Sequence, residues 1–240
     1  MKKAMSMILM GAMIIATLAG CAGQAPGSTG GSSVAQASGG DAALWYSPIV
    51  TEEAAKAEKL IEGKRKILIV IDMQNDFIDG ALGTPEAQAM LPACIEKIKS
   101  YDPKDVYATM DTHFEDNYMD TWEGKNLPVL HCIKDTEGWQ LQSEIDELIP
   151  MDHRFIKYTF GSLDLQQFII DLASKEDIEL EFVGLCTDIC VVSNAMLCKA
   201  AVPSMSITVD AAACAGVTPE THDAALTTMA TCQMVVINND

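Results

Sequence analysis

Basic residues are scarce in this chain of 240 residues. Sixteen lysines and arginines stand against 34 aspartates and glutamates, so the formal net charge is -18 and the isoelectric point is near 4.4. A chain this acidic is repelled by the phosphates of nucleic acids and of anionic membrane surfaces. We therefore expect no nucleic-acid partner.

Two other absences narrow the chemistry. None of the eight cysteines forms a Cys-x-x-Cys pair, which argues against a thioredoxin-like redox motif and against a standard zinc ribbon. No internal repeat is visible. Histidine occurs only four times, so a pattern that uses two histidines carries weight.

The sequence also lacks an apolar run long enough to cross a membrane. The run from Ala4 to Ala19 falls short of the roughly 20 residues that a spanning helix needs. Together with Lys2 and Lys3 it has the charged start and short apolar stretch of a secretory signal. A transmembrane helix is the alternative interpretation.

This leader ends in Leu18-Ala19-Gly20-Cys21, which resembles a bacterial lipobox. By that resemblance residues 1–20 are a signal peptide and Cys21 is lipidated, so the membrane is a partner through a lipid anchor only. The Gly-, Ser- and Ala-rich residues that follow have no periodicity, and we assign residues 21–48 to the anchor and a flexible linker. The folded domain then spans residues 49–240 and is expected to be extracytoplasmic.

From residue 64 onward, strand and helix patterns alternate. This alternation predicts an α/β fold with a doubly wound, mostly parallel sheet and helices on both faces. The predicted strands are 66–71, 105–110, 154–157, 180–185, 204–209 and 234–237, and the predicted helices are 51–60, 85–100, 140–148, 164–174, one that starts near 187, and 219–231. Residues 114–139 form a long irregular segment, which in a compact domain indicates function or disorder.

Cys190 follows the buried strand 180–185 by one turn of chain. Thr187 or Asp188 is expected to cap the helix that starts there. The partial positive charge of a helix N-terminus favours the thiolate, and free amides nearby can bind an oxyanion. The alternative is a buried core cysteine, since free cysteine is among the most buried residue types.

Two more reactive groups stand at the ends of predicted strands. Asp72 follows strand 66–71, and Lys157 ends strand 154–157. A carboxylate can take the thiol proton of Cys190, and an ammonium can stabilise the thiolate, so the set suits amide hydrolysis through a thioester. Taken singly, Asp72 could bond loop amides and Lys157 could be a solvated surface charge.

A second constellation combines Asp111, His113 and His131. The Asp-x-His pair ends strand 105–110, and a distant histidine can complete three ligands that leave open positions on a metal ion. The alternative is a surface aspartate with two histidines bonded to the backbone.

The motifs in their order resemble the isochorismatase-like cysteine hydrolase superfamily, with the nicotinamidase branch nearest. The resemblance covers about residues 64–238. It is carried by Ile71-Asp72-Met73-Gln74-Asn75-Asp76-Phe77, Asp111-Thr112-His113, Leu130-His131-Cys132, Lys157-Tyr158-Thr159-Phe160-Gly161-Ser162 and Gly184-Leu185-Cys186-Thr187-Asp188-Ile189-Cys190-Val191.

The resemblance implies roles for these positions. Asp72, Lys157 and Cys190 would be the catalytic triad, and Asp111, His113 and His131 would bind one divalent metal ion, zinc, iron or manganese. The Leu185-Cys186 peptide would be cis, with the amides of Cys186 and Cys190 directed at the oxyanion. Phe77 and Gln74 are assigned to the substrate pocket, and Trp122 and Tyr158 are further aromatic candidates.

The family pattern differs here at two points. The family commonly has a small residue at the position of Cys186, and nicotinamidases often have a tryptophan just before the later metal histidine, where this chain has Asn126 to Leu130. The expected function is metal-dependent hydrolysis of nicotinamide or a similar small amide to acid and ammonia. The alternatives are a related hydrolase that acts on an N-carbamoyl compound or a vinyl ether, and a non-catalytic binding lipoprotein. The resemblance also allows a homo-oligomer.

Overall fold

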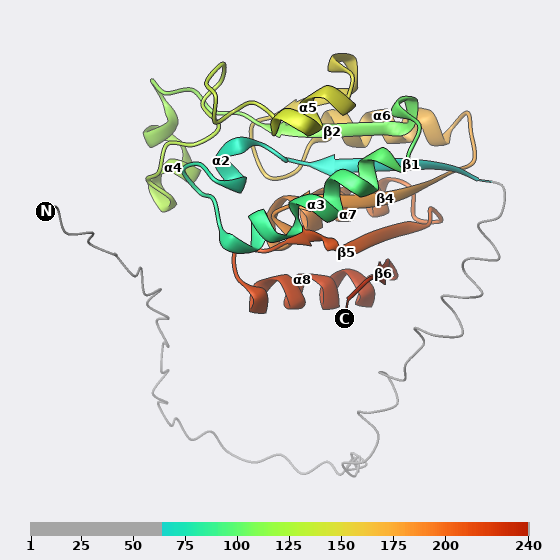
Figure 1. The fold of residues 1–240 in the computed structure, drawn as a ribbon. Helices are drawn as coiled ribbons and strands as arrows, with labels where there is room; N and C mark the ends of the chain where they lie inside the picture. Colours follow the sequence, from blue (N-terminus) through green and yellow to red (C-terminus); the bar gives the residue numbers. More distant parts are fainter. Residues whose placement is uncertain (1–63, 240) are drawn as a thin grey trace, which may run out of the picture. The chain divides into compact units, whose positions relative to one another are not determined.

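A single sheet of six strands forms the centre of the domain (Figure 1). The computed structural model describes residues 64–239, so the leader, Cys21, the linker and the helix predicted at 51–60 lie outside the described residues. The sheet order is β3-β2-β1-β4-β5-β6, and each neighbouring pair is parallel. The strands are β1 (Arg65–Ile71), β2 (Val106–Asp111), β3 (Arg154–Lys157), β4 (Ile178–Leu185), β5 (Ile207–Ala215) and β6 (Val235–Ile237).

Helices cover both faces of this sheet, which confirms the predicted doubly wound α/β class. One core layer is packed by α3 (Pro85–Lys99) and α5 (Ser143–Leu148). The opposite layer is packed by three helices: α6 (Leu163–Ala173), α7 (Val192–Ala201) and α8 (Pro219–Thr231). The shorter helical segments are α2 (Asn75–Ile78), η2 (Pro103–Asp105), η3 (Tyr118–Asp120), α4 (Trp122–Asn126), η4 (Met151–His153) and the π-helical turn η5 (Thr187–Val191).

Strand β1 shows why a parallel central strand appears in sequence as an unbroken apolar run. Residues 67–71 are fully buried. Ile67, Ile69 and Ile71 point to the layer of α6, α7 and α8, whereas Leu68 and Val70 point to the layer of α3. Because both faces are covered there, every position from 67 to 71 is apolar.

The chain order places a crevice between β1 and β4. From β1 the chain builds β2 and β3 on one side, and then crosses over to build β4, β5 and β6 on the other. In sheets of this kind, ligands bind outside the carboxyl ends of the strands at such a switch point. Gly184 allows these two strands to approach closely there, since its φ is 115° and a Cβ would lie 2.1 Å from the carbonyl oxygen of Ile71.

The structure differs from the predicted elements in two places. Strand β5 starts at Ile207 and continues to Ala215, well past the predicted end at Val209, because the small side chains of Ala213 and Ala215 fit in the core layer of α3. The segment 114–139 contains the helical turns η3 and α4. None of the helices described here combines the length and the apolar composition that crossing a bilayer requires.

Candidate active site

Asp72, Lys157 and Cys190 meet in the crevice at the carboxyl end of the sheet. Asp72 directly follows β1, Lys157 ends β3, and Cys190 lies in η5 after β4. The Nζ atom of Lys157 is 2.7 Å from Oδ2 of Asp72 and 3.5 Å from Sγ of Cys190. All three side chains are buried, so their charges interact with little screening by water. The structure therefore brings the three predicted triad residues together.

The Asp72 carboxylate is held from two sides. Thr109 on β2 donates a hydrogen bond from its hydroxyl to Oδ1 at 2.7 Å. Oδ2 faces Lys157, and no described group donates a well-aligned hydrogen bond to it. Burial raises the pKa of Asp72 although the charge of Lys157 opposes this. A carboxylate with a raised pKa and a free lone pair is suited to accept a proton.

Burial and neighbouring charges shift the pKa values of Lys157 and Cys190. Burial alone would lower the pKa of Lys157, but the carboxylates of Asp72 and Asp111 outweigh it and raise that pKa well above its usual range. Burial, together with the charge of Asp72, raises the pKa of Cys190 well above its usual range. Burial therefore opposes the thiolate that a helix N-terminus alone would favour.

The local turn also differs from the expected capped helix. Cys186 stands at the cap of η5 and makes no side-chain cap bond. Thr187 instead bonds Nδ1 of His222 on α8 at 2.8 Å, and the Asp188 carboxylate accepts from the amide of Val217 at 3.1 Å. Both side chains thus hold η5 against the α8 region, which anchors the segment that carries the nucleophile candidate.

Cys186 precedes this turn, and its peptide bond to Leu185 is cis, as the resemblance implied. Its carbonyl oxygen accepts from the amides of Ile189 and Val191 at 3.1 and 3.0 Å, which closes the turn. Its side chain is half-buried and lines the same cavity as Cys190. The oxyanion role of the two cysteine amides stays a prediction.

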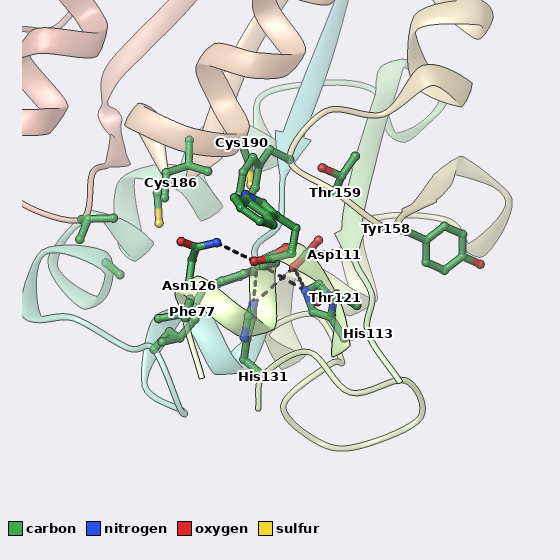
Figure 2. Close-up of a pocket in the computed structure, with 18 of the residues that line it drawn as sticks. Phe77, Asp111, His113, Thr121, Asn126, His131, Tyr158, Thr159, Cys186 and Cys190 are labelled. Carbon is green, nitrogen blue, oxygen red and sulfur yellow. Dashed lines mark hydrogen bonds and ion pairs between the residues drawn. The ribbon is translucent and has the colours of Figure 1, made fainter. Parts of the chain in front are cut away.

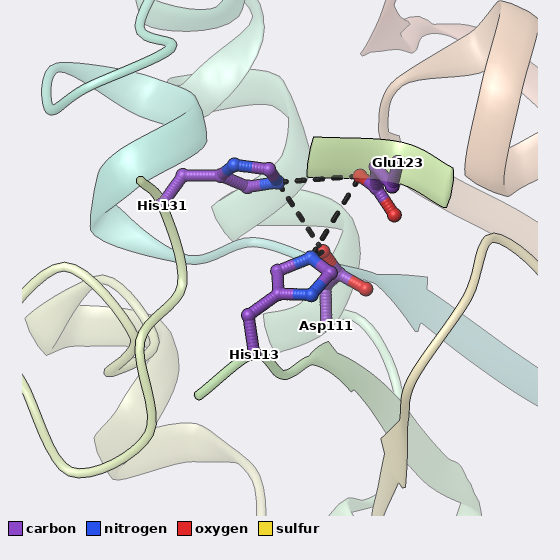
Figure 3. Close-up of side chains that lie close together, drawn as sticks. All are labelled: Asp111, His113, Glu123 and His131. Atoms are coloured by element: carbon purple, nitrogen blue, oxygen red, sulfur yellow. Dashed lines mark hydrogen bonds and ion pairs between the residues drawn. The ribbon is translucent and has the colours of Figure 1, made fainter. Parts of the chain in front are cut away.

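A second cluster stands beside the first (Figure 3). Asp111, His113, Glu123 and His131 each offer one ligand atom, and these atoms lie within 4.8 Å of one another. Nε2 of His113 is 2.9 Å from Oδ2 of Asp111, and Nε2 of His131 is 3.6 Å from the same oxygen. Oε1 of Glu123 is 3.7 and 3.5 Å from the two Nε2 atoms. The three predicted metal ligands therefore come together with one acidic residue that the sequence did not single out.

Glu123 was missed because it lies in the segment 114–139, where no periodicity distinguishes one acidic residue from another. The structure places it on α4, next to Trp122. The hydroxyl of Thr121 caps that helix by accepting from the amide of Gly124 at 2.9 Å. A threonine cap just ahead of the glutamate was the available signal.

The donor set of this cluster fits a divalent metal ion. Two imidazole nitrogens with two carboxylate oxygens are ligands that zinc, iron and manganese accept. Nδ1 of His131 is 2.8 Å from the carbonyl oxygen of Val129, which leaves Nε2 facing the cluster. Burial alone would lower the pKa of His131, but bonds to Asp111 and Glu123 raise it to about 9. The cluster thus attracts positive charge.

Asp111 joins the two clusters. Its Oδ1 is 3.0 Å from Nζ of Lys157, while its Oδ2 accepts from His113. Burial alone would raise the pKa of Asp111, but the bonds from His113 and His131 and the charge of Lys157 hold it well below its usual range. A charge placed in one cluster is therefore felt in the other.

A cavity of about 700 Å³ opens onto both clusters (Figure 2). Phe77, Trp122 and Tyr158 line it, as do Cys186 and Cys190. Asp72 and Lys157 are not among the lining residues and lie beneath the thiol of Cys190.

Gln74, which the resemblance assigned to the substrate pocket, does not line the cavity. Its side-chain amide donates to the carbonyl oxygens of Asp111 and Trp139 at 2.8 Å each and accepts from the Asp111 amide at 2.7 Å. The side chain is fully buried. With all these groups satisfied internally, Gln74 holds the end of β2 in place.

Comparisons with known proteins agree with this architecture. Residues 66–240 match the isochorismatase domain family. An uncharacterized isochorismatase family protein, PncA of Bacillus subtilis (strain 168), is 32% identical over 147 residues, which are 55% of this chain and 77% of that protein. The crystal structure of nicotinamidase/pyrazinamidase PncA from Bacillus subtilis is 26% identical, with a TM-score of 0.60 over 72% of this chain and 98% of that chain.

The pyrazinamidase of Pyrococcus horikoshii, solved in complex with zinc, has the same fold at 24% identity. Its TM-score is 0.59, over 72% of this chain and 98% of that one. The family match covers well over half of the chain and includes every residue of both clusters. This chain belongs to the isochorismatase family of hydrolases.

Proposed function

We propose that this protein is a metal-dependent cysteine amidohydrolase, which converts nicotinamide or a similar small amide to the acid and ammonia. The observation that carries the proposal is the contact of Lys157 with both Asp72 and Cys190 beneath a cavity that also holds a metal-binding cluster. The likeness to a nicotinamidase/pyrazinamidase supports this substrate class.

The first half of the reaction forms a thioester. The Asp72 carboxylate takes the proton of the Cys190 thiol as the sulfur attacks the amide carbonyl carbon and forms a C–S bond. The charge of Lys157 stabilises the developing thiolate, and we assign the amides of Cys186 and Cys190 to the oxyanion. The C–N bond then breaks, the nitrogen takes the proton from Asp72, and ammonia leaves.

The second half returns the enzyme to its starting state. Water attacks the thioester carbonyl while Asp72 takes one of its protons. The C–S bond breaks, the acid product forms, and the proton returns from Asp72 to the sulfur of Cys190. The raised pKa of Asp72 suits this task, because the carboxyl must hold and release the proton in each half.

Asp111, His113, Glu123 and His131 would hold the metal ion. Bound there, a divalent ion would supply Lewis acidity and a fixed ligand position for the substrate. The protein also orients the imidazole rings. The carbonyl oxygen of Val129 bonds Nδ1 of His131 and so directs its Nε2 toward the metal site.

A screen of small amides for ammonia release tests the proposal. We expect the full chain, loaded with metal, to release ammonia from nicotinamide or a close analogue, and the Cys190→Ala variant to release none. An N-carbamoyl compound and a vinyl ether are included in the screen. Turnover of one of these in place of every simple amide would contradict the proposal.

We further propose that the enzyme acts outside the cytoplasm, held by a lipid on Cys21. The support is the leader with its lipobox-like Leu18-Ala19-Gly20-Cys21. Fractionation of cells that make the natural chain or a Cys21→Ser variant tests this. Membrane-bound natural protein and a released variant are expected, whereas natural protein that stays in the cytoplasm with Met1 retained would contradict the anchor.

A further inference from the structure

The cavity is larger than a single-ring amide needs. Its volume of about 700 Å³ lies within the range of clefts that bury drug-sized ligands, roughly 300 to 1,000 Å³. A cavity of about 150 Å³ is already large enough to bind benzene. Nicotinamide has only about nine non-hydrogen atoms, so more than half of the cavity lies beyond a ring bound at Cys190.

The lining of the cavity carries no lysine or arginine among the described residues. Asp111 and Glu123 are its acidic members, and the Lys157 ammonium is buried beneath and already paired with Asp72 and Asp111. Beyond the metal-binding cluster, a substrate carboxylate would find no lysine or arginine among the described lining residues and would lose its water shell. This composition favours an uncharged substrate.

The outer part of the cavity is apolar and aromatic. Trp122 is 82% exposed, and Phe160 is 43% exposed, yet both line the cavity, as does the partly exposed Leu127. Large apolar side chains that are exposed together at one opening mark a binding surface.

The chain holds this surface in place. Trp122 is the first residue of α4, whose Gly124 packs so closely on η3 that a Cβ would lie 2.0 Å from the carbonyl oxygen of Tyr118. On the other side of the opening, Tyr158 stacks on Phe114 with ring centroids 6.0 Å apart. The tryptophan is therefore presented to the cavity by a fixed helix, next to the metal-cluster residue Glu123.

We propose that the natural substrate is an uncharged primary amide with an apolar extension, which packs on Trp122 and Phe160 at the cavity mouth while its carboxamide lies at Cys190. The inference rests on the proposed amidohydrolase function and narrows its substrate class. It argues against substrates that place a carboxylate at this apolar mouth.

Three probe amides test the inference: nicotinamide, a ring-phenylated nicotinamide, and the same compound with a carboxylate on the phenyl group. One added methylene in an apolar pocket changes kcat/KM by roughly 10-fold or more, so we expect at least a tenfold gain from the phenyl group. The carboxylate should cancel this gain.

The Trp122→Ala variant should reduce the ratio of kcat/KM for the phenylated amide to that for nicotinamide. Met151→Ala is the matched control, because Met151 is similarly exposed but stands before β3 and does not line the cavity. An equal ratio in natural protein, Trp122→Ala and Met151→Ala would overturn the inference. A Trp122→Ala variant that changes the oligomeric state in light scattering, with the ratio unchanged, would also overturn it in favour of a subunit interface.

A binding measurement separates this inference from the proposed function. Calorimetry with the Cys190→Ala variant needs no turnover, and we expect it to bind the phenylated amide at least ten times more tightly than nicotinamide. Equal binding together with ammonia release from nicotinamide would overturn the extended substrate alone. If the natural enzyme releases no ammonia from any of the three probes, the proposed function fails whatever the affinities are.

Discussion

Asp111 separates two groups of charged side chains that differ in their access to the cavity. On one side, only Cys190 of the triad lines the cavity, while Asp72 and Lys157 lie beneath it, and a lysine neutralises the carboxylates. On the other side, the metal cluster of Asp111, His113, Glu123 and His131 lines the cavity and faces carboxylates with imidazoles.

This difference in burial and charge shows how one crevice can hold a nucleophile and a metal-binding cluster side by side. Burial raises the pKa of the Cys190 thiol, so its deprotonation needs the base that lies next to it. The metal cluster collects negative charge where substrate enters, so a cation can be held there. Asp111 contacts both groups. A substitution in the triad should leave metal binding intact, and a substitution in the metal cluster should leave the triad in place.

The largest expected effect comes from breaking the triad at Cys190. Cys190→Ala should reduce ammonia release to background while metal content, measured by elemental analysis, stays at the natural level. Cys186→Ala is the control, since it changes a neighbouring thiol in the same cavity and only its backbone amide is assigned a role, so its loss should be far smaller. Mass spectrometry that places a trapped acyl adduct on Cys186 would show that the triad is wrong.

Removal of the charge that links the two groups should be next in size. Lys157→Met leaves Asp72 and Asp111 buried without their cation, which should cost about 3 to 5 kcal/mol of unfolding free energy as well as most of the activity. Urea denaturation measures the first effect. The double variant Lys157→Met with Asp72→Asn should regain part of the stability, and no regain would mean that the pair is not coupled as described.

Disruption of the metal cluster should lower activity but leave the triad in place. Chelation should reduce ammonia release, and added zinc or manganese should restore it. Glu123→Gln should weaken metal affinity by roughly tenfold, because it replaces a charged ligand by a neutral one. Glu137, an exposed acidic residue of the same segment, provides the matched control as Glu137→Gln. Full activity in protein that elemental analysis finds free of metal would refute the metal's role.

The smallest effect is expected behind the triad, at His222. Burial lowers the pKa of His222 below its usual 6.5, so the folded protein resists a proton that the unfolded chain accepts. Stability contributed by the neutral ring is therefore full above about pH 7 and declines as the pH falls through about 6.5. His222→Asn keeps a polar atom near the Thr187 hydroxyl and removes this titration. The difference in melting temperature between about pH 7.5 and pH 5.5 should be smaller in the variant, and an equal difference would contradict the assignment.

Several features of the site were accessible from local sequence. The unbroken apolar run before Asp72 indicates a strand covered on both faces, and such strands deliver the residue after them to the carboxyl edge of a parallel sheet. Asp111 and Lys157 are the last residues of β2 and β3, and Cys190 follows the end of β4 by five residues. Their convergence follows from topology, because parallel strands all end at one edge.

What only the tertiary structure decided depends on neighbours distant in sequence. Glu123 joins the metal cluster because α4 folds over the cavity, and Gln74 turns away from substrate because Asp111 and Trp139 satisfy its amide. The helix start alone does not set the pKa of Cys190, which is raised by burial and by the charge of Asp72, a residue more than a hundred positions earlier. Strand ends are encoded locally by apolar patterning, whereas a side chain's partners and charge state are set by the dielectric and the groups that the complete fold assembles around it.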